Sequence, residues 1–276
     1  SIAESKDFKA TLDKVKLFNP DVILSITGFE CFEEDVNLFR QFKTEIPNSV
    51  FIFFGHYATQ FPKETLNFSN ADYIVLGEPE LVLDQLLRAI SNGKELSLVN
   101  GIAFKAKDGN IIIQGQNGRI KDPNDLPIPA YDLLPNAKHY YEPLIPKPYG
   151  MIQTIRGCPY QCNYCVTSYG SKIGQLSTER IIKEIKILKE VHGVKAIRFI
   201  DDTFTINKRR IIELCSIIIE EQLDINWVCL SRTDNLDIDI LKWMKKAGCI
   251  RIYFGMESGS QRMLDIYQKN TTIDKA

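Results

Sequence analysis

The stretch that decides the fold of this chain occupies residues 156–165 and reads RGCPYQCNYC. Three of the chain's seven cysteines fall inside it, as Cys158, Cys162 and Cys165, with the spacing C-x3-C-x2-C. The other four cysteines are scattered along the sequence. An odd number of cysteines, three of them clustered, favours a metal or catalytic site over a disulfide framework.

Three interpretations of the clustered cysteines are open. On a helix their positions would share one face and pack as small apolar side chains, but Gly157 and Pro159 argue against a helix interior. A structural zinc site needs four protein ligands, and no partner pair of Cys or His is visible nearby in the sequence. Three thiolates on one loop suit a 4Fe-4S cluster whose fourth iron is left open for chemistry.

The sequence around and after the cysteines alternates apolar runs with helix-spaced apolar positions. We expect strands at residues 151–155, 195–200, 226–230 and 250–254, and helices at residues 178–191, 207–221 and 237–247. Such consecutive strand-helix units fit either a doubly wound sheet or part of a barrel, and periodicity alone does not choose between them.

The sequence before the cysteines shows the same alternation. Apolar runs at residues 22–26, 50–54 and 73–76 are each followed by a glycine-containing loop, and helix-spaced apolar residues lie between them. The second of these loops covers residues 55–59. This α/β pattern predicts a parallel sheet with helices on both faces, in which ligands bind outside the carboxyl ends of the strands.

Two features mark the boundary between the halves. Two short alternating runs, residues 102–106 and 110–114, are joined through an Asp-Gly pair, which predicts a hairpin. Residues 123–148 hold many of the chain's 12 prolines and read as an extended connector. We therefore expect one domain at residues 1–98, a hairpin and proline-rich linker at 99–148, and a second domain at 149–276.

Composition excludes several classes of protein. The 276 residues correspond to about two domains, and 44% apolar with 25% charged residues is ordinary for a globular chain. Lys plus Arg at 34 against Asp plus Glu at 35 gives a net charge of −1, so we expect no nucleic-acid partner. No apolar stretch approaches the ~20 residues of a membrane span, and no signal peptide is visible. We expect a cytoplasmic protein with no membrane partner.

The cysteine spacing, with the aromatic Tyr164 before the third cysteine and a strand before the loop, resembles the radical S-adenosylmethionine (SAM) enzymes. The resemblance implies a partial (β/α) TIM-type barrel in which Cys158, Cys162 and Cys165 hold a catalytic 4Fe-4S cluster. In that family, SAM binds the open iron, and an electron from the cluster cleaves a C–S bond of SAM. The resulting 5'-deoxyadenosyl radical abstracts hydrogen. An electron donor such as flavodoxin or ferredoxin is implied as a partner.

Three further segments at predicted strand ends resemble the segments with which that family binds SAM, although residues 199–204 lack the Gly-Gly-Glu of many relatives. The residues that the resemblance assigns to SAM are Tyr164, Asp201, Asp202, Arg232, Glu257 and Ser258. A simpler interpretation is open for each residue alone, because paired acids often begin helices and an arginine often forms a surface ion pair.

Residues 19–89 resemble the cobalamin-binding domain fused before many radical SAM domains, which implies a partial, doubly wound (Rossmann-like) fold. The residues that would line the cobalamin site are Thr27, Gly28, Gly55, His56, Tyr57, Thr59, Gly77 and Glu78. The sequence has no Asp-x-His-x-x-Gly run, so His56 is not placed as an axial cobalt ligand. Both domains look incomplete against the family pattern, and we expect the 276 residues to be part of a longer enzyme.

The resemblance implies a small-molecule enzyme that uses a 4Fe-4S cluster, SAM and cobalamin to methylate an unactivated carbon or phosphorus. One alternative uses the same cofactors without methylation, as in oxidative ring closure of a tetrapyrrole-like substrate by the anaerobic magnesium-protoporphyrin monomethyl ester cyclases. Another is a non-catalytic module that binds an iron-sulfur cluster or a corrinoid. The sequence does not identify the substrate.

Overall fold

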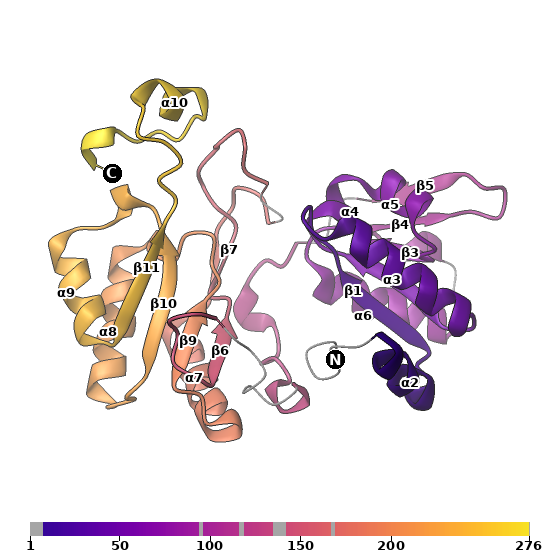
Figure 1. The fold of residues 1–276 in the computed structure, drawn as a ribbon, viewed down its shortest axis with the longest axis horizontal. Helices are drawn as coiled ribbons and strands as arrows, with labels where there is room; N and C mark the ends of the chain where they lie inside the picture. Colours follow the sequence, from indigo (N-terminus) through magenta and orange to yellow (C-terminus); the bar gives the residue numbers. More distant parts are fainter. Residues whose placement is uncertain (1–7, 94–95, 116–118, 135–141, 167–168, 276) are drawn as a thin grey trace.

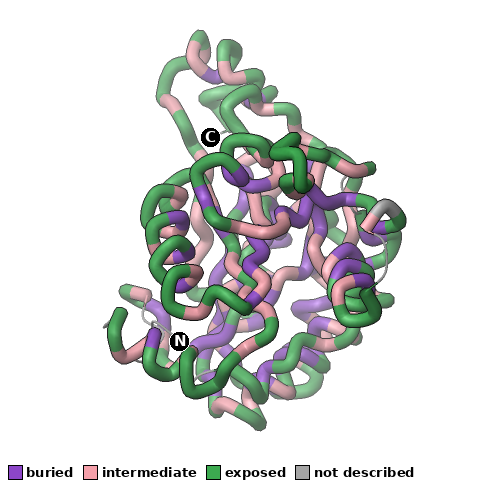
Figure 2. Tube along the Cα trace, turned by 90° about the vertical axis from the view of Figure 1, so that its right-hand side faces the viewer, coloured by how far each residue is buried: buried purple, intermediate pink, exposed green. Residues whose placement is uncertain are grey.

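Two main sheets organise the chain (Figure 1). The computed structural model describes residues 8–93, 96–115, 119–134, 142–166 and 169–275. The other residues of the two predicted domains and of the predicted linker lie outside the described residues. Buried stretches run through the interior of the molecule, and exposed stretches cover its outside (Figure 2). No helix in the described ranges is long and apolar enough to cross a membrane.

The N-terminal sheet has five strands in sequential order, with β1, β2 and β3 parallel and β4 and β5 antiparallel. The strands are β1 Val22–Ile26, β2 Val50–Phe54, β3 Tyr73–Val75, β4 Ile102–Lys105 and β5 Ile111–Gln114. Strands β4 and β5 form the predicted hairpin, but β4 pairs with β3. The hairpin therefore extends the first sheet, a placement that the turn signal alone does not reveal.

Helices cover both faces of this sheet, as predicted. They are α2 Phe8–Phe18, α3 Phe32–Glu45, α4 His56–Gln60, α5 Pro62–Phe68 and α6 Pro79–Ser91. On one face Phe39 of α3 stacks on Phe53 of β2, with ring centroids 3.8 Å apart. On the other face Leu86 of α6 packs with Ile52 and Val75.

The connection between β2 and β3 differs from the expected loop at residues 55–59. It contains two short helices, α4 and α5. Ala58 of α4 is fully buried in the same core cluster as Phe53, so the segment packs onto the sheet. A five-residue helix is too short to show the apolar periodicity from which a helix is predicted.

The C-terminal sheet is parallel, and its strands follow one another in sequence order. Its strands are β6 Tyr149–Ile152, β9 Ala196–Phe199, β10 Asn226–Ser231 and β11 Cys249–Phe254, joined by α7 Thr178–His192, α8 Lys208–Glu220 and α9 Ile238–Lys246. Residues of all three helices share one buried cluster with the strands. One-directional winding with the helices on one face is the geometry of a partial barrel, which decides the alternative that periodicity left open.

Helices α7, α8 and α9 each begin at a capping side chain. Side chains of Ser177, Asn207 and Asp237 each accept a hydrogen bond from the backbone N–H three residues further on. These bonds satisfy donors that the first helical turn leaves without partners.

The prediction of one continuous strand at residues 151–155 is wrong, because the strand is interrupted after Ile152. Strand β6 ends at Ile152, and β7 Ile155–Arg156 pairs instead with β8 Gly174–Gln175 in a separate antiparallel ribbon. The interruption has a physical cause, because the Asp201 carboxylate accepts hydrogen bonds from the backbone N–H groups of Thr154 (2.5 Å) and Ile155 (2.8 Å). Apolar periodicity carries no information about such a distant acceptor.

The proline-rich connector packs against the C-terminal half. Its described part contains two short 3-10 turns, Pro123–Asp125 and Tyr131–Leu133. The Tyr131 hydroxyl donates to Glu184 of α7 at 2.7 Å, and Arg180 of α7 donates to two backbone carbonyls of the connector. The connector is therefore held along α7.

Trp227 on β10 anchors the core of the C-terminal half. Its ring contacts Phe199 and Phe204, and its indole N–H donates to the carbonyl of Ala247 at 2.8 Å. Replacement Trp227→Ala leaves a large cavity, and we expect a loss of about 3–5 kcal/mol in the free energy of unfolding. Urea denaturation measures it, and the partly buried Trp243 serves as control. An equal loss from Trp243→Ala would contradict this assignment.

Candidate active site

The cysteine loop, residues 157–166, leaves strand β7 and lies at the carboxyl end of the C-terminal sheet. Cys158 is buried, Cys162 is half-buried and Cys165 is exposed. The Cys158 N–H donates to the carbonyl of Gly170 at 3.1 Å, and the Cys165 N–H donates to that of Cys162 at 3.1 Å. These bonds fix the path of the loop between its thiols.

Gly157 is required at the entrance to this loop. Its φ of +86° lies in the left-handed region, and a Cβ atom there would lie 2.0 Å from the carbonyl oxygen of Lys172. Only glycine permits both this dihedral angle and this close backbone approach.

The Cys165 thiol lies near several ionisable groups. Burial raises the pKa of Cys165, and Asp202, Cys158 and Cys162 raise it further. Within the described ranges, no three His, Cys, Asp or Glu side chains are gathered so as to hold one metal ion. A 4Fe-4S cluster asks for a different donor set, with thiolate ligands spread around a larger body, and three thiols on one loop fit that requirement.

The two neighbouring acids after β9 have different surroundings. Asp201 is 1% exposed, and besides the two backbone groups it accepts a hydrogen bond from the Thr154 hydroxyl at 2.5 Å. Its carboxylate therefore binds groups of the protein itself, whereas the resemblance predicted that it would bind SAM. Asp202 remains accessible; partial burial raises the pKa of its carboxyl, and the charge of His56 lowers it.

Arg232, after β10, lies beside the cysteine loop. Its guanidinium forms an ion pair with Asp234 at 2.7 Å and lies 3.8 Å from the ring centroid of Tyr160. Its Nη1 atom is 3.9 Å from the Sγ atom of Cys162. The arginine thus brings positive charge to a thiol of the loop while it orders the segment after β10.

Glu257 and Tyr164 meet through Lys269. The Lys269 ammonium donates to Glu257 at 2.9 Å and to the Tyr164 hydroxyl at 3.1 Å, and the Lys269 carbonyl accepts from Arg232 at 2.7 Å. The hydrogen bond from Lys269 holds the pKa of Glu257 below its usual range. Ser258, the next residue, accepts a hydrogen bond from the Ser260 N–H.

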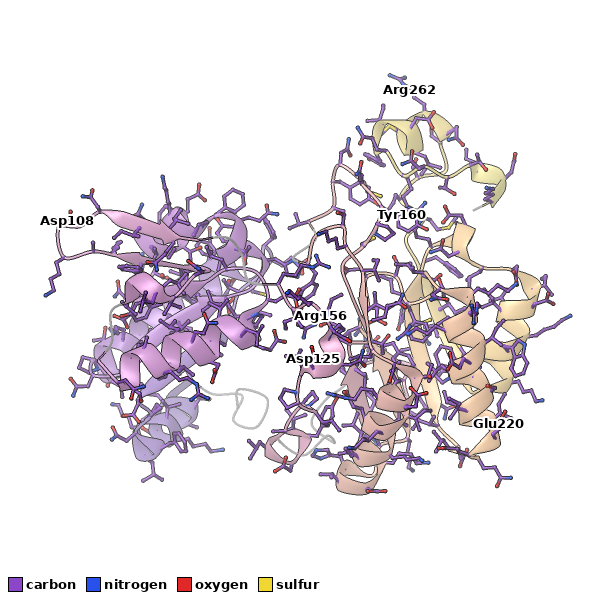
Figure 3. The ribbon with its side chains drawn as sticks, turned by 180° about the vertical axis from the view of Figure 1, so that it is seen from behind. Asp108, Asp125, Arg156, Tyr160, Glu220 and Arg262 are labelled. Atoms are coloured by element: carbon purple, nitrogen blue, oxygen red, sulfur yellow. The ribbon has the colours of Figure 1, made fainter. Side chains whose placement is uncertain are left out.

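Sequence reasoning missed two members of this network. Lys269 lies beyond the last predicted strand in no recognisable motif, so no sequence signal marks it. Tyr160 lies within the cysteine motif, but its contact with Arg232 is formed across 72 positions. Figure 3 shows Tyr160 in the cysteine loop and Arg156 between the two halves of the molecule.

Several predicted residues of the N-terminal half come together at the carboxyl ends of β1, β2 and β3. The Thr27 N–H donates to the carbonyl of Phe54 at 2.9 Å, and the Gly77 N–H donates to the Thr59 hydroxyl at 3.1 Å. Gly55 has a φ of +109°, and a Cβ atom there would lie 2.6 Å from the Thr27 carbonyl. We call Thr27, Gly28, Gly55, Thr59 and Gly77 the strand-end crevice, after their position at the carboxyl ends of the strands.

The strand-end crevice has room at Gly28 and a polar group nearby. No atom lies within 4 Å of the position that a Cβ atom of Gly28 would occupy. The Thr27 hydroxyl is buried beside the Asp35 carboxyl; burial raises the pKa of that carboxyl, and the interaction with Thr27 lowers it.

Three predicted cobalamin-site residues have other partners. Tyr57 stacks on Phe32 with centroids 3.9 Å apart, and its hydroxyl donates to Glu64. Glu78 is 3% exposed and forms an ion pair with Arg156 of the other half. The structure places His56 at the start of α4, within electrostatic range of Asp202.

The family model described as the radical SAM superfamily matches residues 152–276. This segment is a radical SAM domain. The family resemblance and the α/β fold expected from the sequence are thereby confirmed.

Relatives match the chain beyond the radical SAM domain. The uncharacterized methyltransferase PH0819 of Pyrococcus horikoshii is 35% identical over 275 residues, covering 98% of this chain and 59% of that protein. The anaerobic magnesium-protoporphyrin IX monomethyl ester cyclase of Rubrivivax gelatinosus is 26% identical over 270 residues, covering 95% and 48%. The chain thus spans about half the length of these relatives.

A solved structure shows the same fold. The cobalamin-dependent SAM radical enzyme OxsB, with aqua-cobalamin and SAM bound, matches with a TM-score of 0.81 and 21% identity. The match covers 98% of this chain and 40% of that chain. Both sheets and the radical SAM domain are therefore arranged as in a known enzyme.

The buried carboxyl of Asp201 predicts a pH dependence of stability. Burial raises the pKa of Asp201 from 3.8 to about 6, so the folded state binds this proton more tightly than the unfolded state. The stabilisation is present below pH 4 and is lost as the pH rises to about 6. We expect the unfolding free energy of the parent, relative to Asp201→Asn, to fall between pH 4.5 and pH 7. Urea denaturation at both pH values measures it, and a constant difference would contradict the assignment.

Proposed function

We propose that this chain is part of a radical SAM enzyme that uses a 4Fe-4S cluster, SAM and cobalamin to methylate a small molecule at an unactivated carbon or phosphorus. The observation that carries the proposal is the placement of the C-x3-C-x2-C loop at the carboxyl end of a parallel partial barrel. Active sites of such barrels form at this end of the sheet.

The cysteine loop supplies the metal ligands in this proposal. Cys158, Cys162 and Cys165 would hold the cluster, which supplies the electron for SAM cleavage. Arg232 places a cation beside Cys162, where it would lie next to the negatively charged ligands of the cluster.

The residues around the loop would bind SAM. Asp202 offers an accessible, negatively charged carboxylate for the amino group of SAM. Arg232 offers a positive charge for the carboxylate of SAM. The remaining residues of the SAM site would be Glu257, Ser258 and Tyr164. Lys269 would fix the orientations of Glu257 and Tyr164. In this proposal Asp201 positions the strand end and does not bind SAM.

The strand-end crevice would bind cobalamin. Gly28 leaves open space at the end of β1, and Gly55, at the end of β2, lies against the Thr27 backbone. Crevices at the carboxyl ends of parallel strands are the usual ligand sites of such sheets. Cobalamin supplies methyl-transfer chemistry when bound.

Two reaction outcomes have support among the relatives. Methylation is favoured because the 35% identical relative is named a methyltransferase. Oxidative ring closure is the second candidate, since the Rubrivivax relative is named a cyclase and matches 95% of this chain.

Loss of one cluster ligand tests the site. In Cys162→Ala, we expect anaerobic reconstitution to leave little bound iron and sulfide, because one of three protein ligands is missing. Iron analysis and visible absorbance measure the loss. Cys31→Ala is the control, since Cys31 is exposed and lies in the N-terminal half. A fully loaded Cys162→Ala variant with retained SAM cleavage would overturn the assignment.

Product analysis of the complete enzyme separates the reaction outcomes. With SAM, cobalamin, reduced flavodoxin as the electron donor and a methyl acceptor, methylation converts one SAM to S-adenosylhomocysteine and a second SAM to 5'-deoxyadenosine. Mass spectrometry of both products is the measurement. Deoxyadenosine without S-adenosylhomocysteine would favour ring closure, and absence of both would favour a non-catalytic binding module.

A further inference from the structure

An ion-pair triad joins the two halves of the molecule. Arg156, directly before the cysteine loop, donates to Glu78 at 2.8 Å and to both carboxylate oxygens of Glu80, at 2.5 and 3.1 Å. The side chains of Arg156 and Glu78 are 16% and 3% exposed. The Glu80 side chain is 36% exposed, so the Arg156–Glu78 pair is the enclosed part of the triad and differs from an ordinary surface ion pair.

Each end of the triad is continuous with a proposed ligand site. Glu78 follows Gly77, whose N–H donates to Thr59 in the strand-end crevice. Arg156 precedes Gly157, whose backbone is fixed against Lys172 with no room for a side chain. Few rotatable bonds therefore separate the crevice from the first cluster cysteine.

The guanidinium is also held from the far side of the cysteine loop. It lies 5.3 Å from the ring centroid of Tyr169, and the Tyr169 carbonyl accepts a hydrogen bond from Arg119 at 2.8 Å. The planar fork of arginine can bind two carboxylates at once, which lysine cannot reproduce.

We propose that Arg156, Glu78 and Glu80 are positioning residues that fix the cysteine loop relative to the strand-end crevice, so that occupancy of either site changes the affinity of the other. The identity of the two ligands rests on the proposed function, but the mechanical link does not. Coupling of this kind is reciprocal: if a ligand at one site changes the affinity of the other site for its ligand, the second ligand changes the affinity for the first by the same factor.

Hydrogen exchange on the metal-free chain tests the link without any cofactor. In the double variant Glu78→Gln, Glu80→Gln, we expect amides of residues 157–166 to exchange about tenfold faster, since charge-assisted hydrogen bonds that hold the loop are weakened. Glu184→Gln is the matched control, because Glu184 is also 3% exposed and pairs with Arg180, itself 15% exposed, within the C-terminal half. Unchanged exchange in the double variant would overturn the proposal.

Rescue distinguishes positioning from general destabilisation. Arg156→Lys keeps the charge and should restore part of the loop protection that Arg156→Gln removes. Equal exchange in these two variants would contradict a role for the ion pairs.

A binding measurement tests the coupling itself. The dissociation constant of hydroxocobalamin, followed by absorbance, should differ severalfold between cluster-free and reconstituted parent, and this ratio should approach one in the double variant. An equal affinity in both forms of the parent would overturn the coupling. If the parent binds no cobalamin, the proposed cofactor is wrong, and the exchange experiment still decides whether the triad holds the loop.

Discussion

The site depends on one buried carboxylate. Asp201, at the end of β9, accepts hydrogen bonds from two backbone N–H groups and one hydroxyl at the point where β6 ends. These bonds take the place of ladder bonds, so the chain leaves the sheet and enters β7, from which the cysteine loop departs. Without this acceptor two buried N–H groups would lack partners, at a cost of about 1–3 kcal/mol each. The start of the loop is thus set by a residue 43 positions after Cys158.

The same logic extends across the molecule. Arg156 ties the entrance of the loop to the N-terminal half, and Arg232 ties its middle to the segment after β10. Lys269 reaches Tyr164 just before the last cysteine. Two cations from distant parts of the sequence, Arg232 and Lys269, therefore contact the loop, and thiolates brought together there would meet positive charge from both.

Local signals explain how much of the fold was predictable. Strands β1 and β2 match the expected residues because both are short apolar runs bounded by turn residues, and α7, α8 and α9 begin beside Ser177, Asn207 and Asp237 because a capping side chain acts within four residues. The break after Ile152 was not predictable, since its cause is Asp201. The cysteine spacing identified the loop, whereas the contacts of Lys269 and Arg156 follow from tertiary packing that no local pattern encodes.

The acids near the loop differ in what remains free to bind a ligand. Asp201 is consumed by backbone and hydroxyl donors, Asp234 by Arg232 and Glu257 by Lys269. For Asp202, which is exposed, burial of part of the carboxyl raises its pKa and the charge of His56 lowers it. A partly desolvated carboxylate gains most from a cationic partner, because its attraction is screened less than in water. Among these four acids, Asp202 is therefore the one whose charge the fold leaves for a bound amine to neutralise.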